Sequence, residues 1–312
     1  MILPEFKKTY TGLYINQESI SAALIAKRKK EFKVMQLCRA PMPAETLRLS
    51  YRTKSIVNPD MFRETVMALT AGLNKKKIDA GVSLPDELTK IFIQRYAEIP
   101  KTESATNKMI AWRMEKKLHT SLENAIISHS LIGQGANRDK ILLVVVGVKD
   151  VIREFELNLL EVGVHAKCVL PAGLNQLNFF ISRLPSKGTI AFIGLFEYFF
   201  TFFVFEDSLL TFYHGTKKGF SDLNFFQDVD MIMRHYLNAN PGKELEQLFV
   251  GSQVAFHREL SDVFNNLSNI DVHVMQEDTI IKIDDRSDKI DLEHDLSYYV
   301  PAIGAACSIL KV

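Results

Sequence analysis

The sequence predicts an α/β protein made of two halves that repeat the same order of strands and helices. Strand, helix, strand and helix follow one another within 40 residues, 141–180, which is the pattern of an α/β crossover unit. Each half also begins with three consecutive strands, followed by a helix and an isolated strand. The halves share no evident sequence identity, so the predicted repeat is one of architecture.

The crossover unit opens with the apolar run Ile141–Val146, whose short length and β-branched residues predict a strand buried on both faces. Gly163 can adopt a positive φ and ends the helix that follows. Residues 165–170 predict a second strand, and 171–173 open a second helix. The apolar positions of the first helix recur at helical spacing and predict one buried face: Val151, Ile152, Phe155, Leu159, Leu160 and Val162.

The first half begins with a predicted β-hairpin over residues 11–26, with a polar turn at 16–18, and a third strand at 31–39. Asn58 is the expected N-cap, and Pro59 the first residue, of a helix that ends at Leu73. The elements expected before the crossover unit are a strand at 80–84, a strand at 89–98, a helix at 104–118, a strand at 125–131 and a loop at 133–137.

The second half begins after a predicted hinge at 186–188. The apolar run 190–205 is shorter than the roughly 20 residues that a spanning helix needs, and Glu197 interrupts it, so it predicts two strands. The elements expected here are strands at 189–194, 198–205, 209–213, 246–251 and 272–274, and helices at 221–237, 257–267 and 300–310.

Composition favours a globular protein with no strong charge bias. The 312 residues leave room for two lobes, and the 47% apolar content is ordinary. With 38 basic and 37 acidic residues, the net charge gives no reason to expect nucleic acid as a partner. Cys38, Cys168 and Cys307 form no CxxC, which favours a reducing compartment without disulfide or zinc. Residues 1–8 lack the apolar core of a signal peptide, so we expect a cytoplasmic protein.

Six stretches, in order along the chain, carry a resemblance to a known family. They are residues 12–25, 81–85, 91–100, 109–117, 142–163 and 248–253. They resemble the opening hairpin, the strand ends and the helices of the PilM family, cytoplasmic actin-like proteins of type IV pilus assembly that are similar to the division protein FtsA. The cytoplasmic domain of the type II secretion protein GspL is a more distant match. No single motif is rare, and the resemblance lies in their order.

The resemblance implies an actin-like fold of two RNase H-like lobes, at residues 1–185 and 186–312, with an FtsA/PilM-type subdomain inserted in the first. The insertion is expected at about 86–164, and it would include the first helix of the crossover unit. PilM-like proteins bind the cytoplasmic N-terminal peptide of PilN, a single-pass inner-membrane protein. The resemblance thus implies a PilN-like partner, other pilus or secretion components, and a peripheral position on the inner membrane. A homo-oligomer or ring is left open.

A site for such a peptide needs apolar surface with a few polar anchors. The candidates in the inserted subdomain are Phe92, Gln94, Tyr96, Trp112 and Arg113. Packing in the core is the alternative role for the apolar side chains among them, and for Trp112 both roles stay open.

The nucleotide site implied by the fold has lost its characteristic residues. An actin-like ATPase binds phosphate between two hairpins, each with an Asp for the Mg²⁺ shell and small residues that let backbone N–H groups approach. Tyr14 and Asn16 stand where the family has Asp and Gly, and 193–198 lacks the family's Asp-Ile-Gly-Ala-Ser-Thr run. Glu18 and Glu197 are the carboxylates that could replace a lost Asp. The degenerate positions that remain are Asn16, Gln17, Gly194, Gly251 and Ser252.

Other chemical motifs are missing from the sequence. It contains no GxxxxGK[ST], HExxH or GxSxG, and its eight histidines are scattered, so we expect no metal site. The acidic segment 284–295 lacks the glycine of a calcium loop and predicts a solvated turn. The lysine clusters at 27–30 and 75–77 also predict solvated turns, with contact to anionic headgroups as the alternative.

We therefore expect a non-catalytic scaffold of a type IV pilus or related secretion machine, with no cofactor. The alternative is an ATP-binding or ATP-hydrolysing FtsA-like protein that switches or polymerises with nucleotide. Nucleotide binding without Mg²⁺ is left open between the two. A sugar-kinase-like enzyme is a third class, but the residues after the second hairpin offer no aspartate as a base.

Overall fold

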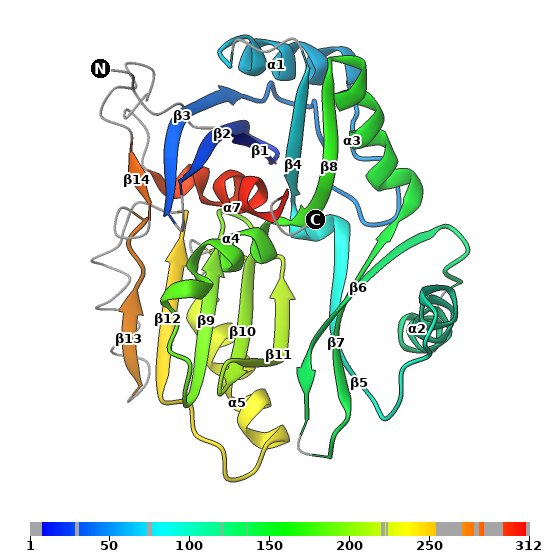
Figure 1. The fold of residues 1–312 in the computed structure, drawn as a ribbon, viewed down its shortest axis with the longest axis vertical. Coiled ribbons are helices and arrows are strands. Elements are labelled where there is room, and N and C mark those ends of the chain that lie inside the picture. Colours follow the sequence, from blue (N-terminus) through cyan, green and yellow to red (C-terminus); the bar gives the residue numbers. More distant parts are fainter. Residues whose placement is uncertain are drawn as a thin grey trace.

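The computed structural model describes residues 8–28, 31–73, 77–119, 121–135, 137–219, 222, 224–253, 270–277, 281–283 and 296–309. Within these residues the strands form three sheets. Two of them lie one above the other in Figure 1, and the third lies beside them.

The first lobe is built on a six-stranded sheet of order β14-β3-β2-β1-β4-β8. The strands β1 to β3 form an antiparallel meander, and β4 and β8 continue from β1 in parallel. The short β14 pairs with β3 and was not predicted. The strands are β1 (Thr9–Ile15), β2 (Ser19–Arg28), β3 (Glu31–Pro41), β4 (Ile78–Leu84), β8 (Val164–Pro171) and β14 (Lys282–Ile283).

The second lobe is built on a five-stranded sheet of order β11-β10-β9-β12-β13. If the first five strands of each lobe are counted along the chain, both sheets place them in the order third, second, first, fourth, fifth. The strands β11, β10, β9, β12 and β13 thus correspond to β3, β2, β1, β4 and β8 of the first lobe. This confirms the predicted architectural repeat. The strands are β9 (Thr189–Leu195), β10 (Phe200–Glu206), β11 (Leu209–Thr216), β12 (Gln247–Ser252) and β13 (Asp271–Val274).

An inserted subdomain lies between β4 and α3 in the sequence. Its three-stranded sheet has the order β5-β7-β6, and α2 covers one face through Ile110, Met114 and the strand residues Tyr96 and Val144. The elements are the short η1 (Asp86–Leu88), β5 (Thr89–Tyr96), α2 (Glu103–Leu118), β6 (Ala125–Gln134) and β7 (Lys140–Val148). Figure 1 places this subdomain at one side of the molecule, with α2 outermost.

Helices cover both faces of the first sheet. On the outer face, α1 begins at Pro59, and the side chain of Asn58 accepts a hydrogen bond from the Met61 N–H at 3.1 Å, which confirms the predicted cap. Between the lobes, α4 and α7 lie side by side (Figure 1). The second sheet carries α5 on its other face. The helices are α1 (Pro59–Ala71), α3 (Lys149–Glu161), α4 (Ala172–Phe180), η2 (Ile181–Arg183), α5 (Phe225–Ala239), η4 (Leu296–Tyr299) and α7 (Val300–Ser308).

Small residues let α7 approach its neighbours closely. A Cβ added at Gly304 would lie 2.0 Å from the backbone oxygen of Asn175 in α4, and one at Gly12 would lie 1.8 Å from the oxygen of Ala302. Such distances are impossible for real atoms, so glycine is required at both contacts. They fix α7 between β1 and α4.

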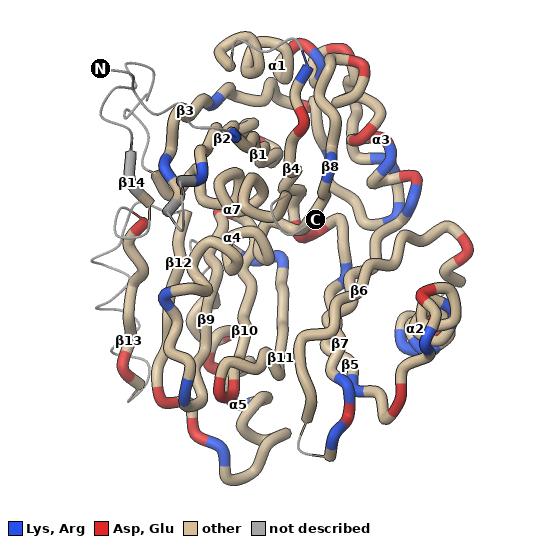
Figure 2. The backbone as a smooth tube through the Cα atoms, viewed as in Figure 1, with Lys and Arg blue, Asp and Glu red and all other residues tan. Residues whose placement is uncertain are grey.

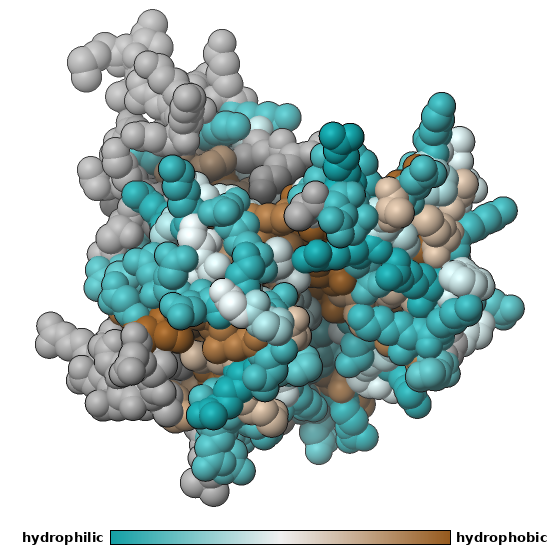
Figure 3. Space-filling view, turned by 90° about the horizontal axis from the view of Figure 1, so that it is seen from below, coloured by the Kyte–Doolittle hydropathy of each residue, from teal (hydrophilic) through white to brown (hydrophobic). Residues whose placement is uncertain are grey.

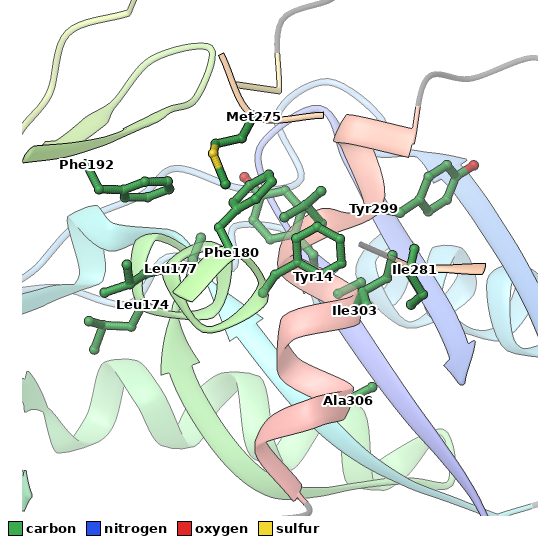
Figure 4. Close-up of a cluster of buried hydrophobic side chains, with 14 of the residues drawn as sticks. Tyr14, Leu174, Leu177, Phe180, Phe192, Met275, Ile281, Tyr299, Ile303 and Ala306 are labelled. Carbon is green, nitrogen blue, oxygen red and sulfur yellow. The ribbon is translucent and has the colours of Figure 1, made fainter. Parts of the chain in front are cut away.

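One apolar core joins the two lobes. Figure 4 shows Tyr14 of β1, Phe180 of α4, Phe192 of β9 and Ile303 of α7 converging on the space between the sheets. The rings of Phe180 and Phe192 are 5.8 Å apart, and all four side chains are at most 4% exposed. The lobes therefore share buried surface instead of meeting only through a hinge.

The first helix of the crossover unit lies in the first lobe, contrary to our expectation that it belongs to the inserted subdomain. Val151, Phe155 and Leu159 of α3 pack with Phe62 and other residues of the first-lobe core. The rings of Phe62 and Phe155 meet edge to face with centroids 6.0 Å apart. The amphipathic pattern fixed one buried face, but it could not show which sheet that face covers.

Most other predicted elements agree with the structure to within a few residues. Gly133 is an exception, because it lies in β6 at a register irregularity and not in a loop. The run 190–205 forms two strands, as predicted, and no helix in the described residues is long and apolar enough to cross a membrane. The predicted helix at 257–267, the acidic segment 284–295 and residues 29–30 and 75–76 of the two lysine clusters lie outside the described residues.

Candidate functional site: the interlobe cleft and a groove beside the inserted sheet

The turns of the two hairpins, β1–β2 and β9–β10, face each other across the interlobe cleft, a cavity of about 40 Å³. The Tyr198 hydroxyl of the second turn donates a hydrogen bond to the Glu18 carboxylate of the first. The cleft is lined by Tyr14, Asn16, Gln17, Glu18, Leu49, Pro85, Asp86, Glu87, Ala172, Phe196, Glu197, Tyr198, Phe199 and Gln253.

The first hairpin uses its polar groups to close its own turn. The Asn16 Oδ1 accepts hydrogen bonds from the backbone N–H groups of Glu18 at 2.9 Å and Ser19 at 2.7 Å. Tyr14 is buried, its ring lies 6.4 Å from that of Phe196, and its hydroxyl donates to the Gln253 Oε1 at 3.5 Å. Burial raises the pKa of the Tyr14 hydroxyl, so this group is neutral.

The glycines expected to face phosphate are covered by side chains of α4 and the second sheet. A Cβ at Gly194 would lie 2.2 Å from the Gln176 Oε1, and one at Gly251 would lie 2.7 Å from the Phe180 ring. Gln176 also donates to the Gly251 carbonyl at 3.3 Å. Ser252 is buried beside these groups in β12. The space beside both glycines, which a phosphate would have to approach, is thus occupied by other side chains of the protein.

The described residues that line the cleft include four acidic ones, Glu18, Asp86, Glu87 and Glu197, and no lysine, arginine or histidine. Asp86 is 4% exposed, and its Oδ2 accepts from the Gly173 N–H at 2.8 Å at the start of α4, while its Oδ1 has no hydrogen-bond partner among the described residues. Burial, opposed by that hydrogen bond and helped by Glu87, raises the pKa of Asp86 to about 8. Burial followed by the nearby Glu18 raises the pKa of Glu197.

The cleft does not fit a magnesium-bound triphosphate. Its described lining offers no basic side chain to phosphate, aromatic rings occupy the space beside the second hairpin, and the hairpin glycine is covered. No group of three or more His, Cys, Asp or Glu in the described part of the chain is arranged to hold a metal ion.

A second cavity, of about 210 Å³, lies between the first lobe and the inserted sheet. We name it the β6–β8 groove. It is lined by Leu84 and Thr89 at the start of the insertion, Ile126 and Ser128 of β6, Val145 and Gly147 of β7, Ile152 and Glu156 of α3, and Ala166, Lys167, Cys168, Val169, Leu170 and Pro171 of β8.

The backbone edge of β8 forms one wall of this groove. Alternate side chains of a strand point to opposite faces, yet residues 166–171 line the groove without a break, so the groove runs along the strand edge. Among the described residues, β8 is the last strand of its sheet, and β6 is the last strand of the inserted sheet. Both strands therefore present backbone groups that another strand could pair with.

The floor of the groove is apolar, with charged side chains at its margin. Ile126 is 37% exposed and pairs with Gly147 across the β6–β7 ladder, and Ser128 pairs with Val145. Lys167 lies 3.4 Å from the Asp79 carboxylate. Burial raises the pKa of the Cys168 thiol, so it is protonated near neutral pH and acts as a small apolar group.

The residues proposed from the sequence for partner binding lie together, but outside this groove. Phe92, Gln94 and Tyr96 are on the face of β5 that α2 covers. The Arg113 guanidinium lies over the Tyr96 ring at 4.7 Å and donates to the Arg95 carbonyl at 2.7 Å. Trp112 is on the outer face of α2 and is 59% exposed.

Sequence reasoning missed the groove and Asp86. The groove arises where β8, α3 and the inserted sheet meet, and these segments are distant in sequence. Asp86 follows Pro85, directly after β4, so it lies outside the two hairpins from which the nucleotide site was predicted.

Together, the two sheets of equal strand order, the helices between them and the facing hairpins define an actin-like protein with an inserted subdomain. Solved structures agree. The structure of a PilM-PilN type IV pilus biogenesis complex matches 96% of this chain and 98% of that chain with a TM-score of 0.80 and 10% identity. At this identity the likeness shows the fold.

Two further solved structures are similar over most of the chain. A protein of actin-like ATPase fold and unknown function from Bacteroides thetaiotaomicron matches 90% of this chain and 96% of that chain, with a TM-score of 0.51 and 8% identity. The cytoplasmic domain of EpsL from the type II secretion system of Vibrio cholerae matches 78% of this chain and 82% of that chain, with a TM-score of 0.47 and 12% identity, too weak a likeness to support an argument. No protein-family model matches the chain, and no curated protein matches it in sequence.

Proposed function

We propose that this chain is a non-catalytic scaffold of a type IV pilus or related secretion machine, and that the β6–β8 groove binds an extended cytoplasmic peptide of a PilN-like inner-membrane protein. The observation that carries the proposal is the continuous lining of the groove by residues 166–171, along a strand edge that has no neighbour among the described residues. Similarity to a PilM structure solved with PilN supports it.

An extended peptide suits this groove in two ways. Its backbone can pair with the open edge of β8 or β6, which supplies hydrogen bonds without regard to sequence. Its alternate side chains then enter the apolar floor formed by Ile126, Val145 and Ile152, while Glu156 and Lys167 offer charged contacts that can select a sequence.

The interlobe cleft has no catalytic part in this proposal. The covered glycines, the aromatic rings and the carboxylates oppose a magnesium-bound nucleotide, and the lobes are joined by the core in Figure 4. The alternative function, an actin-like protein switched by ATP, would need these side chains to move.

Calorimetric titration tests the groove, with a synthetic peptide that has the cytoplasmic N-terminal sequence of the PilN-like protein from the same organism. The Ser128→Arg variant places a bulky charge in the groove from an exposed strand position and should weaken binding about tenfold or more. Ser130→Arg is the matched control, because it makes the same change at an exposed site two residues along β6, outside the groove lining.

The Trp112→Ala variant separates the groove from the residues proposed from the sequence. If the peptide binds the groove, this variant keeps the affinity of the unchanged protein. If Trp112→Ala abolishes binding while Ser128→Arg does not, the peptide site belongs to α2 and the groove assignment fails. A separate titration with ATP decides the cleft: micromolar affinity that requires Mg²⁺ would contradict the non-catalytic scaffold.

A further inference from the structure

The outer face of α2 carries an exposed tryptophan between two lysines. Lys108, Trp112 and Lys116 follow one another at intervals of four, so they lie on one side of the helix. Thr106, Ile110 and Met114 are buried against the inserted sheet. Trp112 therefore plays no part in holding α2 on the protein, although it is the single tryptophan of the chain and is 59% exposed.

Positive charge surrounds the indole ring. The Lys116 ammonium lies 3.6 Å from the ring centroid, and Lys108 makes no ion pair among the described residues. The helix has four basic residues and two acidic ones, Glu103 and Glu115. The Glu115 carboxylate accepts from the Leu122 N–H at 3.0 Å, beyond the end of the helix. Figure 2 shows basic residues on α2 at the edge of the molecule.

An indole between flexible ammonium groups has the chemistry of a membrane interface. Tryptophan is favoured at the depth of lipid headgroups, and nearby lysines are attracted by the negative surface potential of an anionic leaflet. A protein partner would be expected to meet a larger apolar patch from which lysine is depleted. Here the face is convex and peripheral, and neither the interlobe cleft nor the β6–β8 groove includes a residue of α2. Figure 3, which views the molecule from below, shows a face on which hydrophilic residues predominate and hydrophobic residues form smaller areas among them.

We propose that the outer face of α2 binds directly to the surface of an anionic phospholipid bilayer, with Trp112 at headgroup depth and Lys108 and Lys116 beside anionic headgroups. This contact does not depend on the peptide groove. A protein whose partner crosses the membrane would then have a second point of attachment, and two weak attachments raise the overall affinity through effective concentration.

The single tryptophan reports the contact directly. The purified protein, without partner, is titrated with vesicles of equal parts phosphatidylglycerol and phosphatidylcholine, and with vesicles of phosphatidylcholine alone. We expect the fluorescence emission to move to shorter wavelength with the anionic vesicles only, and the movement to shrink at 0.5 M salt, about three times the physiological ionic strength. Unchanged emission with the anionic vesicles at low salt overturns the proposal.

Charge variants exclude a general electrostatic effect. The Lys108→Gln/Lys116→Gln variant keeps the tryptophan, and its vesicle affinity should fall about tenfold or more. The control, Lys54→Gln/Lys187→Gln, removes the same charge at two exposed lysines away from α2 and should bind as the unchanged protein does. An equal loss in both variants overturns the assignment to α2. Soluble poly-glutamate is a further control: if it moves the emission and the vesicles do not, the face binds acidic polypeptide and not lipid.

Discussion

Among single residues, Asp86 is the one whose charge state most affects the molecule. Its carboxyl lies in the interlobe cleft at the start of α4, with one oxygen bonded to the Gly173 N–H and the other without a partner among the described residues. A buried carboxylate with a single hydrogen bond is costly, so the neutral form is favoured.

The raised pKa of Asp86 makes the stability of the protein depend on pH. In the unfolded chain this carboxyl ionises near pH 3.8, and in the folded protein near pH 8. Between these values the folded state keeps a proton that the unfolded state loses, so the free energy of unfolding decreases as pH rises, by up to about 1.4 kcal/mol per pH unit.

The Asp86→Asn variant removes this pH dependence while retaining an oxygen that can accept from Gly173. We expect the variant to gain stability over the unchanged protein as pH rises from 5 to 8, measured by urea unfolding at several pH values. A stability difference that is the same at pH 5 and pH 8 would show that Asp86 does not carry the effect.

At the scale of elements, α3 connects parts of the first lobe that are distant in sequence. Its buried Glu154 accepts hydrogen bonds from the backbone N–H groups of Ser55 and Ile56, in the irregular segment between β3 and α1. The Ile56 bond is 3.3 Å long. Burial raises the pKa of Glu154, and the two N–H donors oppose that rise. This side chain connects the segment to α3, in addition to hydrogen bonds within the segment such as that from the Arg48 N–H to the Ser55 carbonyl at 2.8 Å.

The Glu154→Ala variant leaves both N–H groups buried and unpaired. We expect it to lower the free energy of unfolding by about 2–6 kcal/mol, because each of the two unpaired donors costs about 1–3 kcal/mol. Glu161→Ala is the control on the same helix, since this carboxylate is 60% exposed and its ion pair with Arg63 is worth at most about 1 kcal/mol. Chemical denaturation of both variants checks the prediction, which equal losses would contradict.

The same helix shows what sequence patterns could and could not predict. Periodicity identified α3 and most of its buried face, and the cap at Asn58 placed the start of α1, because both signals are local. Leu160, which was predicted on the buried face, is 50% exposed. The assignment of α3 to the inserted subdomain was wrong, since the packing partner of a helix is set by tertiary contacts. For the same reason the sequence predicted the two hairpins, which are local, but missed the β6–β8 groove, whose walls come from β6, β8 and α3.

At the scale of the whole molecule, the apolar core between the lobes opposes their opening. Phe180 of α4 is fully buried, contacts Phe192 of the second sheet and covers Gly251. Opening the lobes would expose such rings to water, at about 25 cal/mol per Å² of apolar surface. The two lobes should therefore behave as one body, which suits a scaffold that presents fixed surfaces to its partners.

This coupling predicts a single unfolding transition for the lobes and the inserted subdomain. The fluorescence of Trp112 reports on the subdomain, and far-UV circular dichroism reports on the whole chain. Because the inserted strands contribute Ile91 to the core that also holds Phe180, both signals should change at the same denaturant concentration.

The Phe180→Ala variant tests the shared core from the lobe interface. Removing a fully buried ring leaves a cavity, and we expect a loss of about 3–5 kcal/mol. If the core is shared, the loss lowers the midpoint of both the tryptophan and the dichroism transitions equally, although Trp112 lies far from Phe180 along the chain. Ile181→Ala, at a neighbouring side chain that is 43% exposed, should change neither midpoint by much. Two transitions that separate in Phe180→Ala, or a tryptophan transition that does not move, would mean that the lobes unfold independently and that the cleft retains the freedom to open.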